Sequence, residues 1–153
     1  MASIAETHAL LITRSFDAPR ALVFKVWSAP EHVARWWGPK DFVVLEVKLD
    51  FRLGGGWRVG MRSPDGKDYW ASGIYREIKA PERLVFTFAW DEFEDQPTHE
   101  MLVTIGFEDV GGRQTRMRFR QAPFRDVESR DSHVEGWSES FDRMQAFLAS
   151  MPA

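Results

Sequence analysis

The sequence predicts an α+β domain in which a curved antiparallel sheet wraps around one long C-terminal helix, with two short helices between the first two strands. Three observations predict this fold. Segments of alternating hydrophobicity recur between residues 8 and 121. The turns between most of these segments are short, and short turns make neighbouring strands antiparallel. From about residue 126 to residue 150, apolar side chains instead recur at helical spacing.

The chain begins with a predicted strand in "HALLITRSF", where Leu10, Ile12 and Phe16 share one face. The first short helix is expected directly after this strand. Asp17 is the expected cap of its N-terminus, and Pro19 suits the first helical turn.

The second short helix is expected over about residues 31–36, after an interruption at Ala29-Pro30 and before "GP" at 38–39. Trp36 and Trp37 stand at its end. Adjacent helical residues cannot face one direction, so we expect one of these rings to pack inward and the other to cover a rim.

Six further strands are predicted between residues 42 and 121. Their expected inward faces carry Val43, Leu45, Val47 and Leu49; Trp57, Val59 and Met61; Leu84, Phe86, Phe88 and Trp90; Met101, Val103, Ile105 and Phe107; and Thr115, Met117 and Phe119. One-sided alternation of this kind is typical of antiparallel sheets with one wet face. In "DYWASGIYREI" the inward face stays open: Trp70 and Ile74 should point one way and Tyr75 the other.

The long helix has one apolar stripe, and it contains a glycine. The stripe consists of Arg130, His133 or Val134, Trp137, Phe141, Met144 and Leu148. Gly136 costs this helix about 1 kcal/mol relative to alanine. Either the glycine lets the helix approach the sheet closely, or it permits a kink beside a cavity.

Composition limits the class of protein. The 153 residues suggest one domain, 1–153, with 44% hydrophobic and 28% charged residues and a net charge of -3. This balance lacks the basic footprint of a nucleic-acid binder. No apolar run reaches the ~20 residues of a membrane span, so we expect a cytoplasmic protein without a membrane partner. There is no cysteine and no metal-binding spacing of histidines, so no metal or cofactor is expected.

Aromatic residues make up 14% of the chain, with seven Trp and twelve Phe. A curved sheet and a helix fit imperfectly, so a cavity can remain between them, and aromatic walls with a few polar groups suit a small-molecule pocket. The expected walls are Trp57, Trp70, Phe88, Trp137 and Phe141, while His133 and Tyr75 would orient a polar end of the ligand. Aromatic stripes also pack ordinary cores. For His133 the preferred interpretation is a partly exposed histidine with a satisfied hydrogen bond, because a single histidine without a placed partner is weak evidence of a site.

Several motifs, in this order, resemble the START-like (SRPBCC, helix-grip) superfamily and, within it, homologues of the activator of heat-shock protein 90 ATPase. They are "RSFDAPRALVFKVWSAPEHVARWWGP", "GGGWRVGMRSPDGKDYWASGIYREIKAPERLVFTF", "LVTIGFEDVGGRQTRMRFRQ" and "GWSESFDRMQAFL". The resemblance extends from about Leu10 to Leu148. It implies a helix-grip fold with a cavity, in a superfamily of hydrophobic-ligand binders, relatives of polyketide cyclases and a co-chaperone.

Three functions therefore remain open. The first is binding of a small apolar or aromatic molecule in the cavity. The second is an enzyme of polyketide cyclase or hydrolase type, which would need two titratable side chains in contact deep in the pocket. The third is a co-chaperone-like interaction module with a chaperone as partner. A homodimer, formed through edge strands or through Trp36 and Trp37, is also left open.

Overall fold

The computed structural model describes residues 8–91 and 98–151. Its elements in chain order are β1 (Leu10–Phe16), α2 (Arg20–Lys25), α3 (Pro30–Trp36), β2 (Val43–Leu49), β3 (Gly56–Arg62), β4 (Asp68–Lys79), β5 (Arg83–Trp90), β6 (Met101–Val110), β7 (Gln114–Ala122) and α4 (Val127–Ser150). The predicted order of one strand, two short helices, six strands and one long helix is confirmed.

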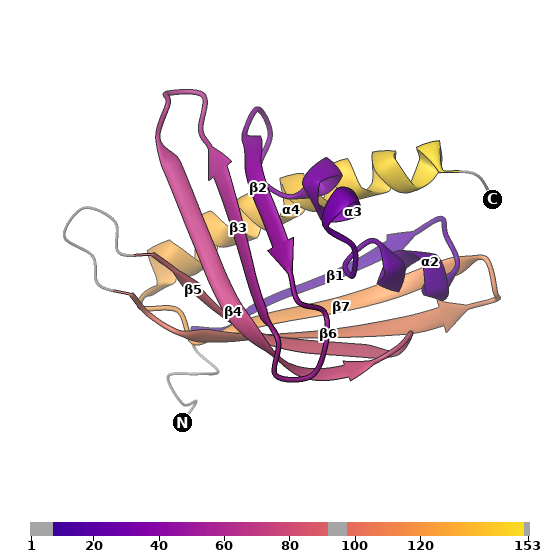
Figure 1. Ribbon diagram of the computed structural model, residues 1–153. Coiled ribbons are helices and arrows are strands. Elements are labelled where there is room, and N and C mark those ends of the chain that lie inside the picture. Colours follow the sequence, from indigo (N-terminus) through magenta and orange to yellow (C-terminus); the bar gives the residue numbers. More distant parts are fainter. Residues whose placement is uncertain (1–7, 92–97, 152–153) are drawn as a thin grey trace.

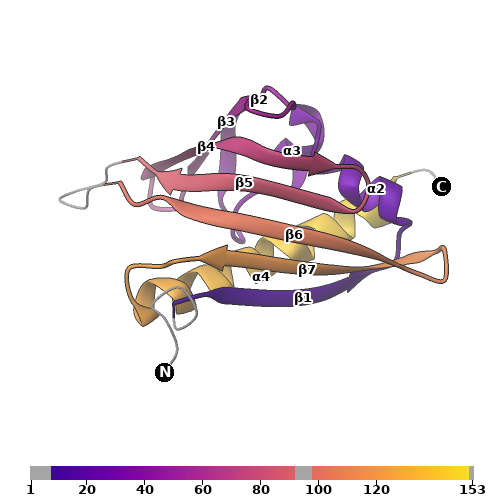
Figure 2. The same ribbon diagram turned by 90° about the horizontal axis from the view of Figure 1, so that it is seen from below.

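The seven strands form one antiparallel sheet in the order β1-β7-β6-β5-β4-β3-β2. The sheet curls around α4, with β2 to β4 rising on one side of the helix and β1, β7 and β6 passing beneath it (Figure 1). Figure 2 shows the lower strands covering α4 from below. The predicted helix-grip architecture is therefore confirmed, and α4 begins at the Asp126 cap, whose carboxylate accepts from the Ser129 N–H at 2.7 Å.

Two expectations about the short helices are wrong. Pro19, and not Asp17, is the N-cap of α2, because Asp17 stands two residues too early to reach the first free N–H groups; its carboxylate accepts from Gln114 instead. Trp36 and Trp37 are both buried. Trp37 follows the end of α3 with an extended backbone, at φ -67° and ψ 137°, so helical spacing no longer directs its side chain outward.

The inward face of β2 also differs from the prediction. A β-bulge lies between Val44 and Glu46, and it shifts the alternation by one residue. Val43 and Leu45 are consequently exposed, whereas Val44 packs against the core. The expected inward positions of Val47 and Leu49, which follow the bulge, are retained.

A glycine in β4 allows a tryptophan to join three strands. Trp57 on β3 lies opposite Gly73 on β4, and its indole N–H reaches across to the Thr87 carbonyl oxygen on β5 at 3.0 Å. A methyl group added at Gly73 would lie 1.8 Å from that oxygen and 2.5 Å from Trp57 Nε1. The absence of a side chain at position 73 therefore makes this crossing possible.

We expect Gly73→Ala to lower the free energy of unfolding by about 3 kcal/mol, because the new methyl group meets a backbone oxygen that cannot move away cheaply. Gly106→Ala in β6 is the matched control, since a methyl group there meets no atom within 4 Å. Urea denaturation of both variants tests this expectation. Equal stabilities would contradict the close approach.

Candidate functional site

A cavity of about 570 Å³ lies between α4, the loop after α3 and the strands β3 to β6. This volume is in the range of small-molecule sites. Its lining consists of Trp37, Gly38, Pro39, Phe42, Met61, Asp68, Tyr69, Trp70, Phe88, Trp90, Asp91, His99, Met101, Phe124, Arg125, Ser129, Ser132, His133, Gly136, Trp137 and Ser140. Exposed residues such as Ser132 and Arg125 stand at its margin, so this side of the cavity reaches solvent.

Aromatic rings make up a continuous part of the wall. Phe88 is at the centre of this group: its ring centroid lies 5.2 Å from that of Trp90, 6.0 Å from that of Trp137 and 6.3 Å from that of Trp37. Trp90 in turn meets Tyr69 edge to face at 6.4 Å. These rings come from β4, β5, α4 and the loop after α3, so only the tertiary fold brings them together.

His133 is the titratable side chain with the most defined setting in the cavity wall. Its Nδ1 lies 2.7 Å from the Ser129 carbonyl oxygen, and its Nε2 accepts from the Trp90 indole N–H at 2.9 Å. A carbonyl oxygen only accepts, so the network assigns the proton to Nδ1 of a neutral imidazole. Burial lowers the pKa of His133, and the hydrogen bond to Ser129 opposes that shift only in part.

Several other polar groups near the cavity are also engaged. The Trp137 indole N–H donates to Gln121 Oε1 at 2.7 Å, and Gln121 is fully buried on β7. The Ser140 hydroxyl donates to the Gly136 carbonyl oxygen at 3.1 Å. His99 Nε2 lies 2.6 Å from the Pro123 carbonyl oxygen. These groups therefore have little hydrogen-bonding capacity to offer a ligand.

Two carboxylates at the margin are held in ion pairs. Asp91 accepts from both terminal nitrogens of Arg58, at 3.0 and 2.7 Å, and these hydrogen bonds lower the pKa of Asp91. Asp68 accepts from Arg62 at 2.7 and 3.1 Å, with the same direction of pKa shift. Both carboxylates therefore stay ionised and are poor candidates for proton transfer at neutral pH.

Arg143 of α4 holds the loop that forms one side of the cavity. Its Nη1 donates to the carbonyl oxygens of Trp37 and Gly38 at 3.0 and 3.1 Å, and burial lowers the pKa of Arg143. Gly38 has φ +101°, a left-handed conformation that favours glycine. The loop thus turns sharply after α3 and is fastened to α4 at the same point.

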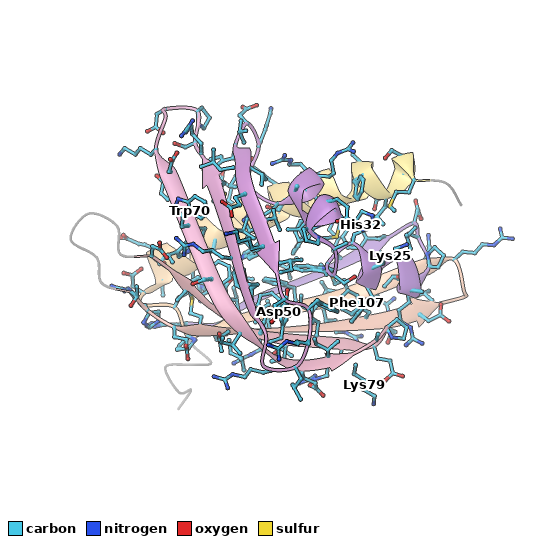
Figure 3. All side chains as sticks on the ribbon, in the orientation of Figure 1. Lys25, His32, Asp50, Trp70, Lys79 and Phe107 are labelled. Carbon is cyan, nitrogen blue, oxygen red and sulfur yellow. The ribbon has the colours of Figure 1, made fainter. Side chains whose placement is uncertain are left out.

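The structure brings only some of the predicted site residues together. Phe88, His133 and Trp137 line the cavity. Trp70 borders it from β4 (Figure 3), but its ring packs under the Arg58 guanidinium, 4.8 Å from the ring centroid, on the outer face of the sheet. The expected opposite orientations of Trp70 and Tyr75 are confirmed by burial, since Tyr75 is only 3% exposed.

Trp57, Tyr75 and Phe141, which were also expected in the wall, are not among the residues that line this cavity. Trp57 and Tyr75 instead line a second, much smaller space, and burial raises the pKa of Tyr75 far above its ordinary value. Phe141 is fully buried against Phe119 and Trp137. For Trp57 and Tyr75 the reason is the curvature of the sheet, because residues on one face of a curved sheet meet different parts of the interior.

Sequence reasoning missed several lining residues. Trp90 was expected on the inward face of its strand with Phe88, but it was not included among the expected walls of the cavity. Trp37, Pro39, Phe42 and Phe124 lie in connecting segments, where no periodicity places a side chain. In the part of the chain that the structure describes, no three His, Cys, Asp or Glu side chains gather in a way that could hold a metal ion.

Gly136 lines the cavity, and its setting contradicts one explanation of the glycine. The nearest atom to an added methyl group is Pro39 Cγ at 3.5 Å, in the loop after α3, so close approach to the sheet is not the reason. The distance is an ordinary van der Waals contact. A side chain here would stand at the cavity wall beside Pro39, so glycine keeps this part of the wall open.

The comparison with known families decides the identity of the fold. The family of Activator of Hsp90 ATPase homolog 1-like proteins matches residues 17–149. The chain belongs to this family. Its members are START-like proteins, as the sequence resemblance implied.

Solved structures agree with this assignment. An AHSA1 protein from Silicibacter pomeroyi is similar at 30% identity and a TM-score of 0.81, covering 92% of this chain and 97% of that chain. A protein from Arthrobacter aurescens has 25% identity and a TM-score of 0.82, with 100% and 91% coverage. One from Chromobacterium violaceum, at 22% identity, supports the fold alone, with a TM-score of 0.83 and coverages of 94% and 99%.

Among proteins whose functions have been curated, none matches this chain in sequence. Within the described residues, no helix has the length and apolar character needed to cross a membrane.

We expect Gly136→Ala to raise the free energy of unfolding by about 0.5–1 kcal/mol, because alanine is the better helix former and its methyl group fits beside Pro39. Chemical denaturation measures the change. A lower stability than that of the wild type would show that the helix needs glycine for its own geometry.

We expect His133 to make stability depend on pH. Its folded-state pKa is lowered. As pH falls below about 6.5, the imidazole of His133 is therefore protonated in the unfolded chain before it is protonated in the folded protein. The contribution of neutral His133 to the free energy of unfolding is complete above that pH, and it is lost as pH falls toward the folded-state pKa. Between pH 7.5 and pH 5.0, the free energy of unfolding should decrease more for the wild type than for His133→Gln, whose side chain keeps a donor and an acceptor. Identical slopes would contradict the assignment.

Proposed function

We propose that this protein binds a small, largely apolar and partly aromatic molecule in the cavity between the sheet and α4. The observation that carries the proposal is a cavity of about 570 Å³ whose wall contains aromatic rings of the buried core. Natural interiors are close-packed, and an unfilled space of this size is typical of a ligand site.

The electrostatics of the wall favour an uncharged ligand. Burial and the hydrogen bond that His133 Nε2 accepts from Trp90 favour a neutral imidazole, and the carboxylates of Asp68 and Asp91 are paired with arginines at the margin. A charged ligand would lose its hydration without gaining a charge partner at the aromatic wall. A flat apolar molecule can instead pack against Phe88, Trp90 and Trp137.

Apolar burial alone can supply a useful affinity. A ligand that buries roughly 300 Å² of apolar surface gains on the order of 7 kcal/mol, before the cost of association is subtracted. The expected dissociation constant is therefore micromolar or weaker. Binding does not need a charged clamp, and the hydrogen bonds of His133 favour binding over proton-transfer chemistry.

Ser132→Phe should weaken binding, because Ser132 lines the cavity at its exposed margin and the larger ring would fill the entrance. We expect at least about a tenfold loss of affinity, since the ligand would lose apolar contact area. Glu135→Phe introduces the same ring at an exposed position of α4 outside the cavity, and this variant should bind the ligand as the wild type does. Intrinsic tryptophan fluorescence and thermal shift with a panel of uncharged aromatic compounds measure the affinities.

A panel without any saturable response, or equal affinities in the two variants, would contradict the proposal and favour a protein partner. Compounds that bind should also be incubated with the protein and recovered. Unchanged compounds are expected of a binding protein, whereas conversion would identify an enzyme.

A further inference from the structure

A second, smaller cavity of about 20 Å³ lies deeper in the interior than the first. Such a space can hold one water-sized group. Its lining consists of Trp27, Val33, Trp37, Leu49, Trp57, Val59, Tyr75 and Phe86. It lies between α3, the segments directly before and after α3, and β2 to β5.

Trp37 separates the two cavities. Among the described residues it is the one that lines both of them. Its ring meets Phe88 and Trp137, which belong to the outer cavity, at centroid distances of 6.3 and 5.2 Å. It also meets Trp57, which belongs to the inner cavity, at 5.7 Å. One indole ring is therefore the partition.

This partition is attached to a turn. Trp37 directly follows α3, and Gly38 with its φ of +101° comes next. The Trp37 carbonyl oxygen is held by Arg143 Nη1 at 3.0 Å. The backbone is thus fastened to α4, while the ring is held by packing against Phe88, Trp137, Trp57 and Trp36. A change of side-chain rotamer would join the cavities without moving the backbone.

One residue that lines the inner cavity, Trp27, has a buried polar atom without a partner. The Trp27 indole N–H is buried and has no hydrogen-bond acceptor within the described residues. The indole N–H groups of Trp36, Trp57, Trp90 and Trp137 all have acceptors. A buried N–H without a partner is unfavourable, and such groups in native proteins call for an explanation.

We propose that the inner cavity is the end of the ligand site, that Trp37 is the gate between its two compartments, and that the Trp27 N–H binds an acceptor oxygen at the leading end of the ligand. This inference rests on the proposed function and specifies its ligand. The ligand class is an elongated aromatic molecule with a carbonyl oxygen at one end. Trp37 and Trp27 are then the residues that determine specificity.

Two probes of matched shape test the acceptor. 4-Acetylbiphenyl has a terminal carbonyl oxygen, and 4-ethylbiphenyl has a methylene group in its place. We expect the wild-type protein to bind the ketone about tenfold more tightly, as one hydrogen bond to a buried donor allows. The Trp27 indole N–H signal in a ¹⁵N-resolved NMR spectrum should move downfield with the ketone and stay in place with the hydrocarbon.

The variants separate Trp27 from its neighbours. Trp27→Phe should remove the preference for the ketone. Trp57→Phe is the matched control, because Trp57 lines the same inner cavity but donates its N–H to Thr87; it should keep the preference. Trp37→Phe shortens the partition, so it should tighten binding of both biphenyls but not of ethylbenzene, which the outer cavity can hold.

Equal affinities of the two biphenyls for the wild type, with an unmoved Trp27 signal, would overturn the inference while binding in the outer cavity stands. A preference that persists in Trp27→Phe would also overturn it. If neither the biphenyls nor ethylbenzene binds, the proposed function and this inference both fail. The NMR measurement on the wild type decides the case even if a variant does not fold.

Discussion

The interior of this protein depends on where its tryptophan N–H groups find acceptors. An indole buries a large apolar area, but its N–H must be satisfied inside the protein. Four acceptors on four different segments meet this need: the Val26 and Thr87 carbonyl oxygens, Gln121 Oε1 and His133 Nε2. Each bond fixes a ring in one orientation and ties together segments far apart in the sequence.

This constraint also shapes the cavity. Trp90 and Trp137 direct their N–H groups to His133 and Gln121, so their polar edges are occupied and their apolar surfaces remain for a ligand. The hydrogen bond from Trp90 also favours the neutral form of His133. Protonation would place a hydrogen on His133 Nε2, where it would meet the Trp90 N–H. The indole N–H of Trp27 is buried without an acceptor among the described residues, and it is the donor that we propose for the ligand.

Three glycines leave the space that neighbouring large side chains occupy. Gly73 lets Trp57 cross β4, and Gly136 leaves the wall of α4 open beside Pro39. Gly38 turns the chain so that Trp37 can stand between the two cavities. The binding site that we propose is therefore a consequence of where side chains are absent as much as of where the aromatic rings stand.

The sequence by itself determined the element order, the antiparallel sheet and the long amphipathic helix, because hydrophobic periodicity and turn residues are local signals. It also indicated Phe88, His133 and Trp137 as candidates. Only the tertiary structure decided which aromatic residues meet. The bulge in β2 exposes Val43 and Leu45, and sheet curvature moves Tyr75 away from the main cavity. Trp37 became the partition because it follows a helix end, where no periodic pattern specifies the direction of a side chain.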